Sequence, residues 1–142
     1  MSTSATGSST SAPQRTATAY VMLSRFALAL IAVQFGLAGS AAFRGLDGKD
    51  TQDSWWAPHI MLGYGIALLT VVLLVLALVQ KLGSAVVRSS VVVAVLSVIL
   101  QPALAGLGDK AGAWIGGLHA LNGVAIAAVL GIVSARLART GG

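Results

Sequence analysis

The sequence predicts an all-α integral membrane protein, an up-down-up-down four-helix bundle built from two tandem helix pairs. Three observations support this prediction. Apolar residues make up 56% of the 142 residues and charged residues only 9%, whereas soluble domains carry about a quarter charged residues. Four apolar runs are each long enough to cross a bilayer. A short polar pattern also occurs twice, once in the first two runs and once in the last two.

The chain begins with a polar segment, residues 1–18, which contains mainly Ser, Thr, Ala and Gly. Such a segment buries too little apolar surface to offset the entropy of ordering, so we expect a disordered N-terminal tail. The apolar run that follows is too long for a secretory signal. The membrane domain is expected over residues 19–138, followed by a short C-terminal tail at 139–142.

The four apolar runs lie at about residues 20–43, 55–80, 86–107 and 112–136. Backbone polar groups find no water in lipid, so each run is expected to form a helix even where valine is frequent. The connections between the runs are short. Short connections make neighbouring helices antiparallel, which gives the up-down-up-down order.

Basic residues are unevenly divided between the two predicted membrane faces. If the N-terminus is inside, the inner segments carry Arg15, Arg25, Lys81, Arg88, Arg136 and Arg139. The outer connections carry Arg44, Lys49 and Lys110, together with the acids Asp47, Asp50, Asp53 and Asp109. This bias predicts that both termini are cytoplasmic. The predicted outer interface then holds Trp55, Trp56 and Trp114, and the inner one holds Tyr20.

Composition and charge exclude several classes of function. The chain has no cysteine, which excludes disulfides, thiolate metal sites and thiol redox chemistry. The net charge of +5 is spread over the ends of the spans and does not form one basic face, so the lipid bilayer is the expected partner and nucleic acid is not. No hydrolytic triad, phosphate loop or paired carboxylate is present. Six arginines to three lysines, with abundant Ala, Gly and Val, suggest a bacterial plasma membrane protein.

The repeated pattern consists of a glutamine-led segment, a histidine and a glycine. The first segment is QFGLAG at residues 34–39, and the second is QPALAG at residues 101–106, so four of the six positions are identical. Gln34 precedes His59 and Gln101 precedes His119, and a glycine follows each histidine by four residues, at Gly63 and Gly123. This arrangement suggests two copies of one helix pair.

The two histidines are the candidate functional groups. No predicted span contains Asp, Glu or Lys, and polar groups inside a membrane are costly enough to indicate function. The alternative is that His59 and His119 only form hydrogen bonds between helices. Adjacent helix axes lie about 8–10 Å apart, so the diagonal second and fourth helices are expected about 11–14 Å apart. Two imidazoles with a metal between them fit that gap, with Gly63 and Gly123 admitting either a porphyrin face or a neighbouring helix.

Haem b is the expected cofactor, because a porphyrin supplies the four metal ligands that two histidines lack. A bare zinc or copper ion would need a third protein ligand. Gln34 and Gln101 are candidates to donate to a haem propionate or to the second nitrogen of a histidine, or to bond between helices. Asn122 is a candidate contact for a quinone or for a water molecule behind His119, and equally for an interhelical bond.

The repeated pattern consists of Gln34, His59, Gln101 and His119, with Gly39 five residues after the first glutamine and Gly106 five residues after the second. With this pattern, residues 25–136 resemble one four-helix half of haem A synthase. The resemblance implies that His59 and His119 are axial haem ligands. The chain departs from the family's catalytic half, which has a glutamate three residues before a ligand histidine, where this sequence has Trp56. The chain also lacks the cysteine pair in the loop that precedes this histidine. The chain is also similar to small uncharacterised bacterial four-helix membrane proteins.

These observations favour a haem-b protein that transfers electrons between quinol and an outer acceptor, and not a stand-alone haem A synthase. The alternative is a cofactor-free accessory subunit that packs in a homodimer or larger membrane complex through faces of small residues such as Gly36, Gly116 and Gly131. A small transporter or channel is a third hypothesis, although the expected intramembrane carboxylates are lacking.

Overall fold

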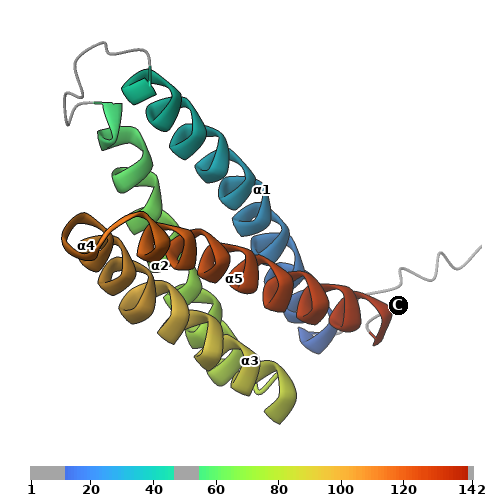
Figure 1. Ribbon diagram of the computed structural model, residues 1–142. Coiled ribbons are helices and arrows are strands. Elements are labelled where there is room, and N and C mark those ends of the chain that lie inside the picture. Colours follow the sequence, from blue (N-terminus) through green and yellow to red (C-terminus); the bar gives the residue numbers. More distant parts are fainter. Residues whose placement is uncertain (1–11, 47–54, 141–142) are drawn as a thin grey trace, which may run out of the picture.

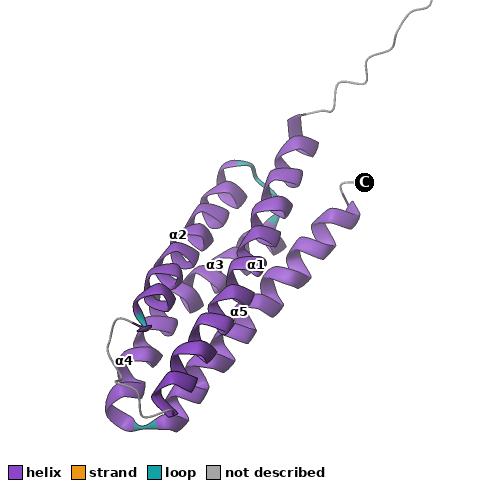
Figure 2. Cartoon of the chain, turned by 90° about the horizontal axis from the view of Figure 1, so that it is seen from above, coloured by secondary structure: helices purple, strands orange, loops and turns teal. Residues whose placement is uncertain are grey.

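The computed structural model describes residues 12–46 and 55–140 (Figure 1). The elements are α1 (Ala12–Leu46), α2 (Ala57–Val79), α3 (Ser84–Val95), a π-helical turn η2 (Leu96–Leu100), α4 (Gln101–Ala111) and α5 (Ala113–Thr140). No strand occurs in these two ranges (Figure 2). The predicted all-α class is therefore confirmed.

Four helical stretches are long and apolar enough to cross a membrane. They are Ala17–Phe43, Ala57–Val79, Ser84–Gly108 and Trp114–Arg139. The third stretch contains α3, η2 and α4 as one continuous helix. Each stretch overlaps one of the predicted apolar runs, and the protein is a multi-pass membrane protein.

Both ends of the helical region differ from the prediction. The tail predicted for residues 1–18 is too long, because α1 begins at Ala12; residues 1–11 lie outside the described part. Pro13 occupies the first turn, where its missing N–H and fixed φ are tolerated. At the other end α5 continues to Thr140, beyond the predicted domain end at 138. Ala, Arg and Leu favour the helical conformation in water as well as in lipid, so a helix can continue beyond the end of its apolar run.

The four spans form a ring of antiparallel neighbours. α1 packs against α2 and α5, α2 packs against α3, and α4 packs against α5. The second and fourth spans therefore lie at opposite corners of the bundle, as predicted. The link from α4 to α5 is Gly112 alone, whose φ of 104° suits glycine because it has no Cβ.

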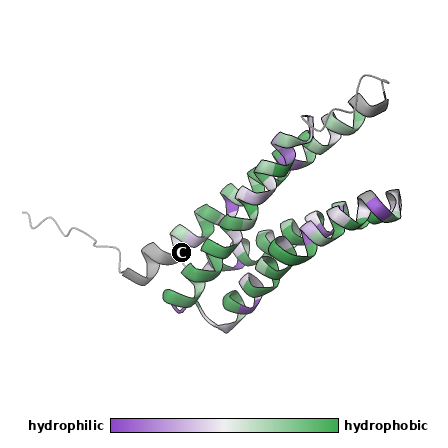
Figure 3. Ribbon diagram, turned by 90° about the vertical axis from the view of Figure 1, so that its left-hand side faces the viewer, coloured by the Kyte–Doolittle hydropathy of each residue, from purple (hydrophilic) through white to green (hydrophobic). Residues whose placement is uncertain are grey.

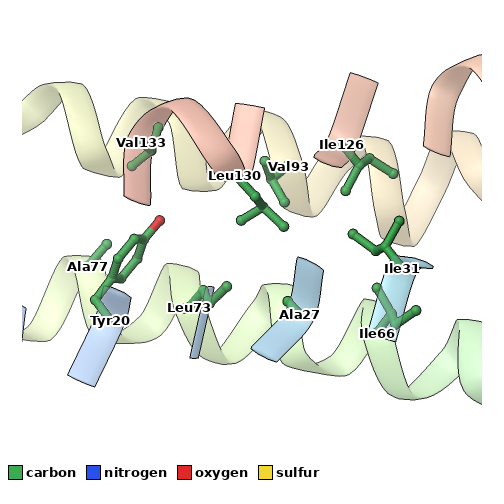
Figure 4. Close-up of a cluster of buried hydrophobic side chains, with 10 residues drawn as sticks. All are labelled: Tyr20, Ala27, Ile31, Ile66, Leu73, Ala77, Val93, Ile126, Leu130 and Val133. Atoms are coloured by element: carbon green, nitrogen blue, oxygen red, sulfur yellow. The ribbon is translucent and has the colours of Figure 1, made fainter. Parts of the chain in front are cut away.

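The packed core occupies the half of the bundle nearer the two described helix ends at Ala12 and Thr140. Its buried residues are Tyr20, Ala27, Ile31, Ile66, Leu73, Ala77, Val93, Ile126, Leu130 and Val133 (Figure 4). Tyr20 is only 1% exposed, and its hydroxyl lies 2.8 Å from Ser90 Oγ. The prediction that Tyr20 anchors the chain at the lipid interface is therefore wrong, because its side chain turns into the bundle, where Ser90 provides a hydrogen-bond partner.

Beyond the core the helices separate into two arms, α1 with α2 and α4 with α5 (Figures 1 and 3). Close approach through glycine occurs within one arm: a Cβ on Gly108 would lie 3.4 Å from the backbone nitrogen of Gly116. An added Cβ on Gly36, Gly116 or Gly131 would meet no atom of the chain within 4 Å. Packing of these small-residue faces against a partner therefore stays a prediction.

Candidate functional site

His59 and His119 meet between the two arms. His59 is the third residue of α2 and His119 is the seventh residue of α5. Their ring centroids lie 6.1 Å apart and their planes are tilted by 56°. Both side chains are half-buried. Although His59 is a turn nearer the start of its helix than His119, the two rings lie close to each other.

Gln34 holds His59 through two hydrogen bonds between α1 and α2. The Nδ1 of His59 lies 3.2 Å from the backbone oxygen of Gln34. In return, Gln34 Nε2 donates to the backbone oxygen of His59 at 2.7 Å. The glutamine and the histidine therefore fix each other, with one side-chain group and one backbone group from each residue.

Gln101 holds His119 in the same way between α4 and α5. The Nδ1 of His119 lies 3.0 Å from the backbone oxygen of Gln101, and Gln101 Nε2 donates to the backbone oxygen of His119 at 3.2 Å. Gln101 Nε2 also lies 3.1 Å from His119 Nε2. This third contact has no counterpart in the first pair.

These contacts define the tautomer of both imidazoles. A carbonyl oxygen can only accept a hydrogen bond, so Nδ1 carries the proton in each ring and Nε2 carries the lone pair. The glutamines are expected from the sequence to donate to the second nitrogen of each histidine; in the structure the direction is reversed, and Nδ1 of each histidine donates to the backbone carbonyl of its glutamine. The Nε2 of His59 forms no hydrogen bond with the described part of the chain.

Asn122 supports the second pair. It is buried, and its Nδ2 donates to Gln101 Oε1 and to the backbone oxygen of Leu96 at 3.1 Å. Of the roles considered for Asn122, the structure shows the interhelical bond. The position three residues after His59 is occupied by Leu62, which has no polar group.

The acceptor Leu96 lies at the start of the π-helical turn. The sequence predicts a kink at Pro102, and the structure places five π-helical residues just ahead of it. Proline has no N–H for the carbonyl of Val98, and its ring would crowd that group in a regular α-turn. The wider turn pairs the Gln101 N–H with Leu96 O, the same oxygen that accepts from Asn122.

The two glycines after the histidines make room for the glutamine side chains. A Cβ on Gly63 would lie 3.1 Å from Gln34 Nε2. A Cβ on Gly123 would lie 3.2 Å from Phe35 Cζ and 3.7 Å from Gln101 Nε2. Of the two predicted alternatives, each glycine therefore admits a side chain from a neighbouring helix, and in both cases that includes the glutamine that holds the preceding histidine.

Two cavities of about 90 and 270 Å³ border both imidazoles. Both are lined by Gln34, His59, Gly63, Ala67, Ser97, Gln101 and His119. The smaller cavity extends past Phe35 and Gly123 toward α1 and α5. The larger one extends past Tyr64 and Pro102 between α2 and α4. A group held between the imidazoles would have space on two sides.

Two buried oxygen atoms at these cavities have no hydrogen-bond partner, Gln34 Oε1 and Ser97 Oγ. Buried polar atoms are normally paired, so an unpaired one indicates a missing water or ligand. Sequence reasoning missed Ser97. Its signal was the helical period, because it lies four residues before Gln101 on the same helix face.

The donor set restricts the metal chemistry that this site can support. Among the described residues, no three or more His, Cys, Asp or Glu residues lie close enough together to hold a metal ion. Two imidazoles alone leave a bare zinc or copper ion short of ligands. They match a metal whose other ligands come from a macrocycle.

Comparison with known proteins identifies one family. Residues 34–111, more than half of the chain, match DUF6220, a family of unknown function. The match includes Gln34, His59 and Gln101 and ends before His119. No curated protein and no solved structure matches the chain.

Proposed function

The chain belongs to the DUF6220 family, and we propose that it binds one haem b through His59 and His119 and transfers electrons in the membrane. The separation of the two rings is the observation that carries this proposal. With a metal–nitrogen bond of about 2.0 Å, two imidazoles on opposite sides of a metal have centroids about 6.3 Å apart. The rings here are 6.1 Å apart, and their tilt is compatible because rotation about the ligand axis is free.

The hydrogen bonds support the same assignment. Histidines that bind metals through one nitrogen usually donate the other N–H to a backbone carbonyl or carboxylate, which fixes the ring orientation. Both Nδ1 atoms donate to backbone oxygens of Gln34 and Gln101. Because Nδ1 is engaged in both rings, Nε2 is the nitrogen that each histidine would use to bind a metal.

When bound, haem would supply reversible one-electron chemistry, while the protein would set its position and its electrostatic surroundings. The cavities of about 90 and 270 Å³ are smaller than the roughly 300–1,000 Å³ of typical ligand pockets. Haem binding is therefore expected to displace side chains that line the cavities, such as Phe35 and Tyr64, while the two histidine rings keep their separation.

A reduced-minus-oxidised absorbance spectrum of the detergent-purified protein tests this function. Cells supplemented with a haem precursor should yield a low-spin b-type spectrum, and His59→Ala and His119→Ala should each lose or shift it. Circular dichroism should show that both variants remain helical. Ser134→Ala, which alters a buried hydroxyl on α5 near the opposite end of the bundle, is the matched control and should keep the wild-type spectrum. Absence of haem from every sample would instead favour a cofactor-free accessory subunit.

A membrane quinol is the proposed electron donor. The larger cavity runs from the imidazoles past Tyr64 and Val98, both exposed on membrane-spanning helices. A lipid-soluble reductant therefore has lateral access to the site from the bilayer. Duroquinol should reduce the wild-type protein, and Val98→Phe, which would narrow this cavity, should slow reduction without removing haem. Equal rates in both proteins would refute the route.

We also infer that both termini are cytoplasmic and that the two Gln–His pairs descend from one duplicated helix pair. The matched hydrogen bonds support the duplication, and the basic residues support the orientation. The chain has no cysteine, so single cysteines report topology directly. In intact cells an impermeant maleimide should label Lys110→Cys but not Ser84→Cys. The reverse pattern would invert the orientation.

A further inference from the structure

The two histidines differ in what already engages the Nε2 lone pair. Gln101 Nε2 lies 3.1 Å from His119 Nε2. Because Nε2 of His119 carries no proton, the amide donates this hydrogen bond. A metal at His119 would have to displace the amide from the lone pair. His59 Nε2 has no such competitor in the described part of the chain.

Asn122 keeps the competing amide in place. Its Nδ2 donates to Gln101 Oε1 while also bonding Leu96 O on the π-helical turn. With the oxygen end fixed, the nitrogen end of Gln101 stays on His119. Gln34 has no such support, because Leu62 occupies the position that corresponds to Asn122 and Gln34 Oε1 is unpaired.

A ring contact adds a second difference in the same direction. The rings of Trp56 and His59 form a T-shaped contact, with centroids 5.8 Å apart and planes at 84°. The residue three positions before His119 is Gly116, which has no side chain. The ring of Trp56 therefore restricts the movement of the His59 ring, whereas Gly116 places no such restriction on the His119 ring.

An unpaired hydroxyl lies at the same place. Ser97 is 6% exposed, its Oγ has no partner, and it lines both cavities together with His119. It precedes Gln101 by one helical turn. A small molecule that took the place of His119 would find this hydroxyl available as a hydrogen-bond donor.

From these observations we propose that His119 is the displaceable member of the pair and that a small neutral ligand with a lone pair can replace it beside Ser97. The proposal rests on the proposed haem binding. On displacement, the lone pair of the ligand would take the place of His119 Nε2, which would then accept the hydrogen bond from the Gln101 amide, while His59 would continue to hold the group.

Carbon monoxide added to the reduced protein is the probe. The wild type should bind it, and Asn122→Leu should bind it about 5- to 10-fold more weakly, the factor that one lost hydrogen bond of ordinary strength represents. Ser134→Ala is the control and should match the wild type. Ser97→Ala should change the C–O stretching frequency, because the ligand loses its hydrogen bond. Unchanged affinity in Asn122→Leu, or no binding in the wild type, would overturn the proposal.

A second variant and a haem-free measurement keep the test decisive. If Asn122→Leu fails to fold, Gln101→Met removes the competing amide at similar length and should weaken carbon monoxide binding likewise. In the metal-free protein, imidazole ¹⁵N spectra should show a hydrogen-bonded Nε2 for His119 and an unbonded one for His59. Asn122→Leu should move only the His119 signal. Identical signals would overturn the inference, whereas loss of haem with distinct signals would refute only the proposed function.

Discussion

The two Gln–His pairs share one geometry but have different surroundings. In each, Nδ1 of the histidine donates to the glutamine carbonyl, and the glutamine amide donates back to the histidine carbonyl. The second pair continues into Asn122 and the π-helical turn. The first pair ends at Gln34 Oε1, which has no partner.

A metal-binding histidine must have a fixed ring orientation and a free metal-binding nitrogen, and the two pairs differ in the second respect. The shared bonds orient each ring and fix its tautomer. Of the bonds found only in the second pair, the one from Gln101 Nε2 acts on His119 Nε2, the nitrogen that would bind the metal, and the two from Asn122 hold Gln101 and the π-helical turn. Two histidines that are held by the same backbone hydrogen bonds, but that differ in the contacts of Nε2, can therefore provide one firm and one weaker metal ligand in a nearly symmetric site.

Removal of each histidine in turn has the largest expected effect on this comparison. His119→Ala should retain haem in a five-coordinate, high-spin form, because His59 Nε2 is unopposed. His59→Ala should bind haem about 5- to 10-fold more weakly than His119→Ala, because the remaining His119 must first give up the Gln101 amide. Haem titration of the purified apo-proteins, followed by absorbance, measures the ratio.

The Ser134→Ala variant provides the reference affinity for that titration. Circular dichroism should report equal helicity in the three proteins, so that a difference in affinity reflects the ligand and not the fold. A lower affinity in His119→Ala than in His59→Ala would reverse the assignment of the firm ligand.

The fold could be predicted from hydropathy because the cost of unpaired backbone groups in lipid leaves few alternatives to helices. The histidine pair could be predicted for a related reason, since polar groups at depth are costly. Their partners could not be fully predicted. The acceptors for both Nδ1 atoms are backbone carbonyls, which every residue carries, so no residue type marks them.

Side-chain direction was equally hard to obtain from sequence. Ser97 lies one helical turn before Gln101, but this spacing alone does not separate it from other small residues of a packed helix, and its unpaired buried oxygen is seen only in the structure. Tyrosine is common at membrane interfaces, but the side chain of Tyr20 is buried inside the bundle. A disturbance of the helix at Pro102 was predictable from the missing N–H, but not its form as a π-helical turn, nor that Leu96 O in this turn also accepts a hydrogen bond from Asn122.

The two glycines after the histidines sharpen the comparison with a smaller expected effect. Gly63→Ala would bring a methyl group to 3.1 Å from Gln34 Nε2 and should push the amide off the His59 carbonyl. Gly123→Ala would meet Phe35 Cζ at 3.2 Å, while Gln101 Nε2 at 3.7 Å is an ordinary contact. Overpacking of this kind costs about 1–3 kcal/mol.

Gly63→Ala should therefore lower both thermal stability and haem affinity. Gly123→Ala should lower stability alone, because Phe35 gives way before the His119 pair is touched. Thermal unfolding in detergent and haem titration on the same samples separate the two effects. Gly36→Ala is a suitable control, since an added Cβ there meets no atom within 4 Å. Loss of haem affinity in Gly123→Ala alone would contradict the assignment.

The smallest expected effect comes from giving the first pair the support that only the second pair has. Leu62 lies three residues after His59, as Asn122 lies three residues after His119. In Leu62→Asn, the new amide nitrogen should therefore donate to Gln34 Oε1, which is buried without a partner, as Asn122 donates to Gln101 Oε1. Leu62 packs against the core, so the proper comparison is Leu62→Ala, which loses the same packing without gaining a donor. Leu62→Asn should be more stable than Leu62→Ala by about 0.5–1.5 kcal/mol, the net value of one hydrogen bond. Equal stability of the two variants in thermal unfolding would mean that Gln34 Oε1 is already satisfied, for example by a bound water, and that the asymmetry between the pairs lies in the protein contacts alone.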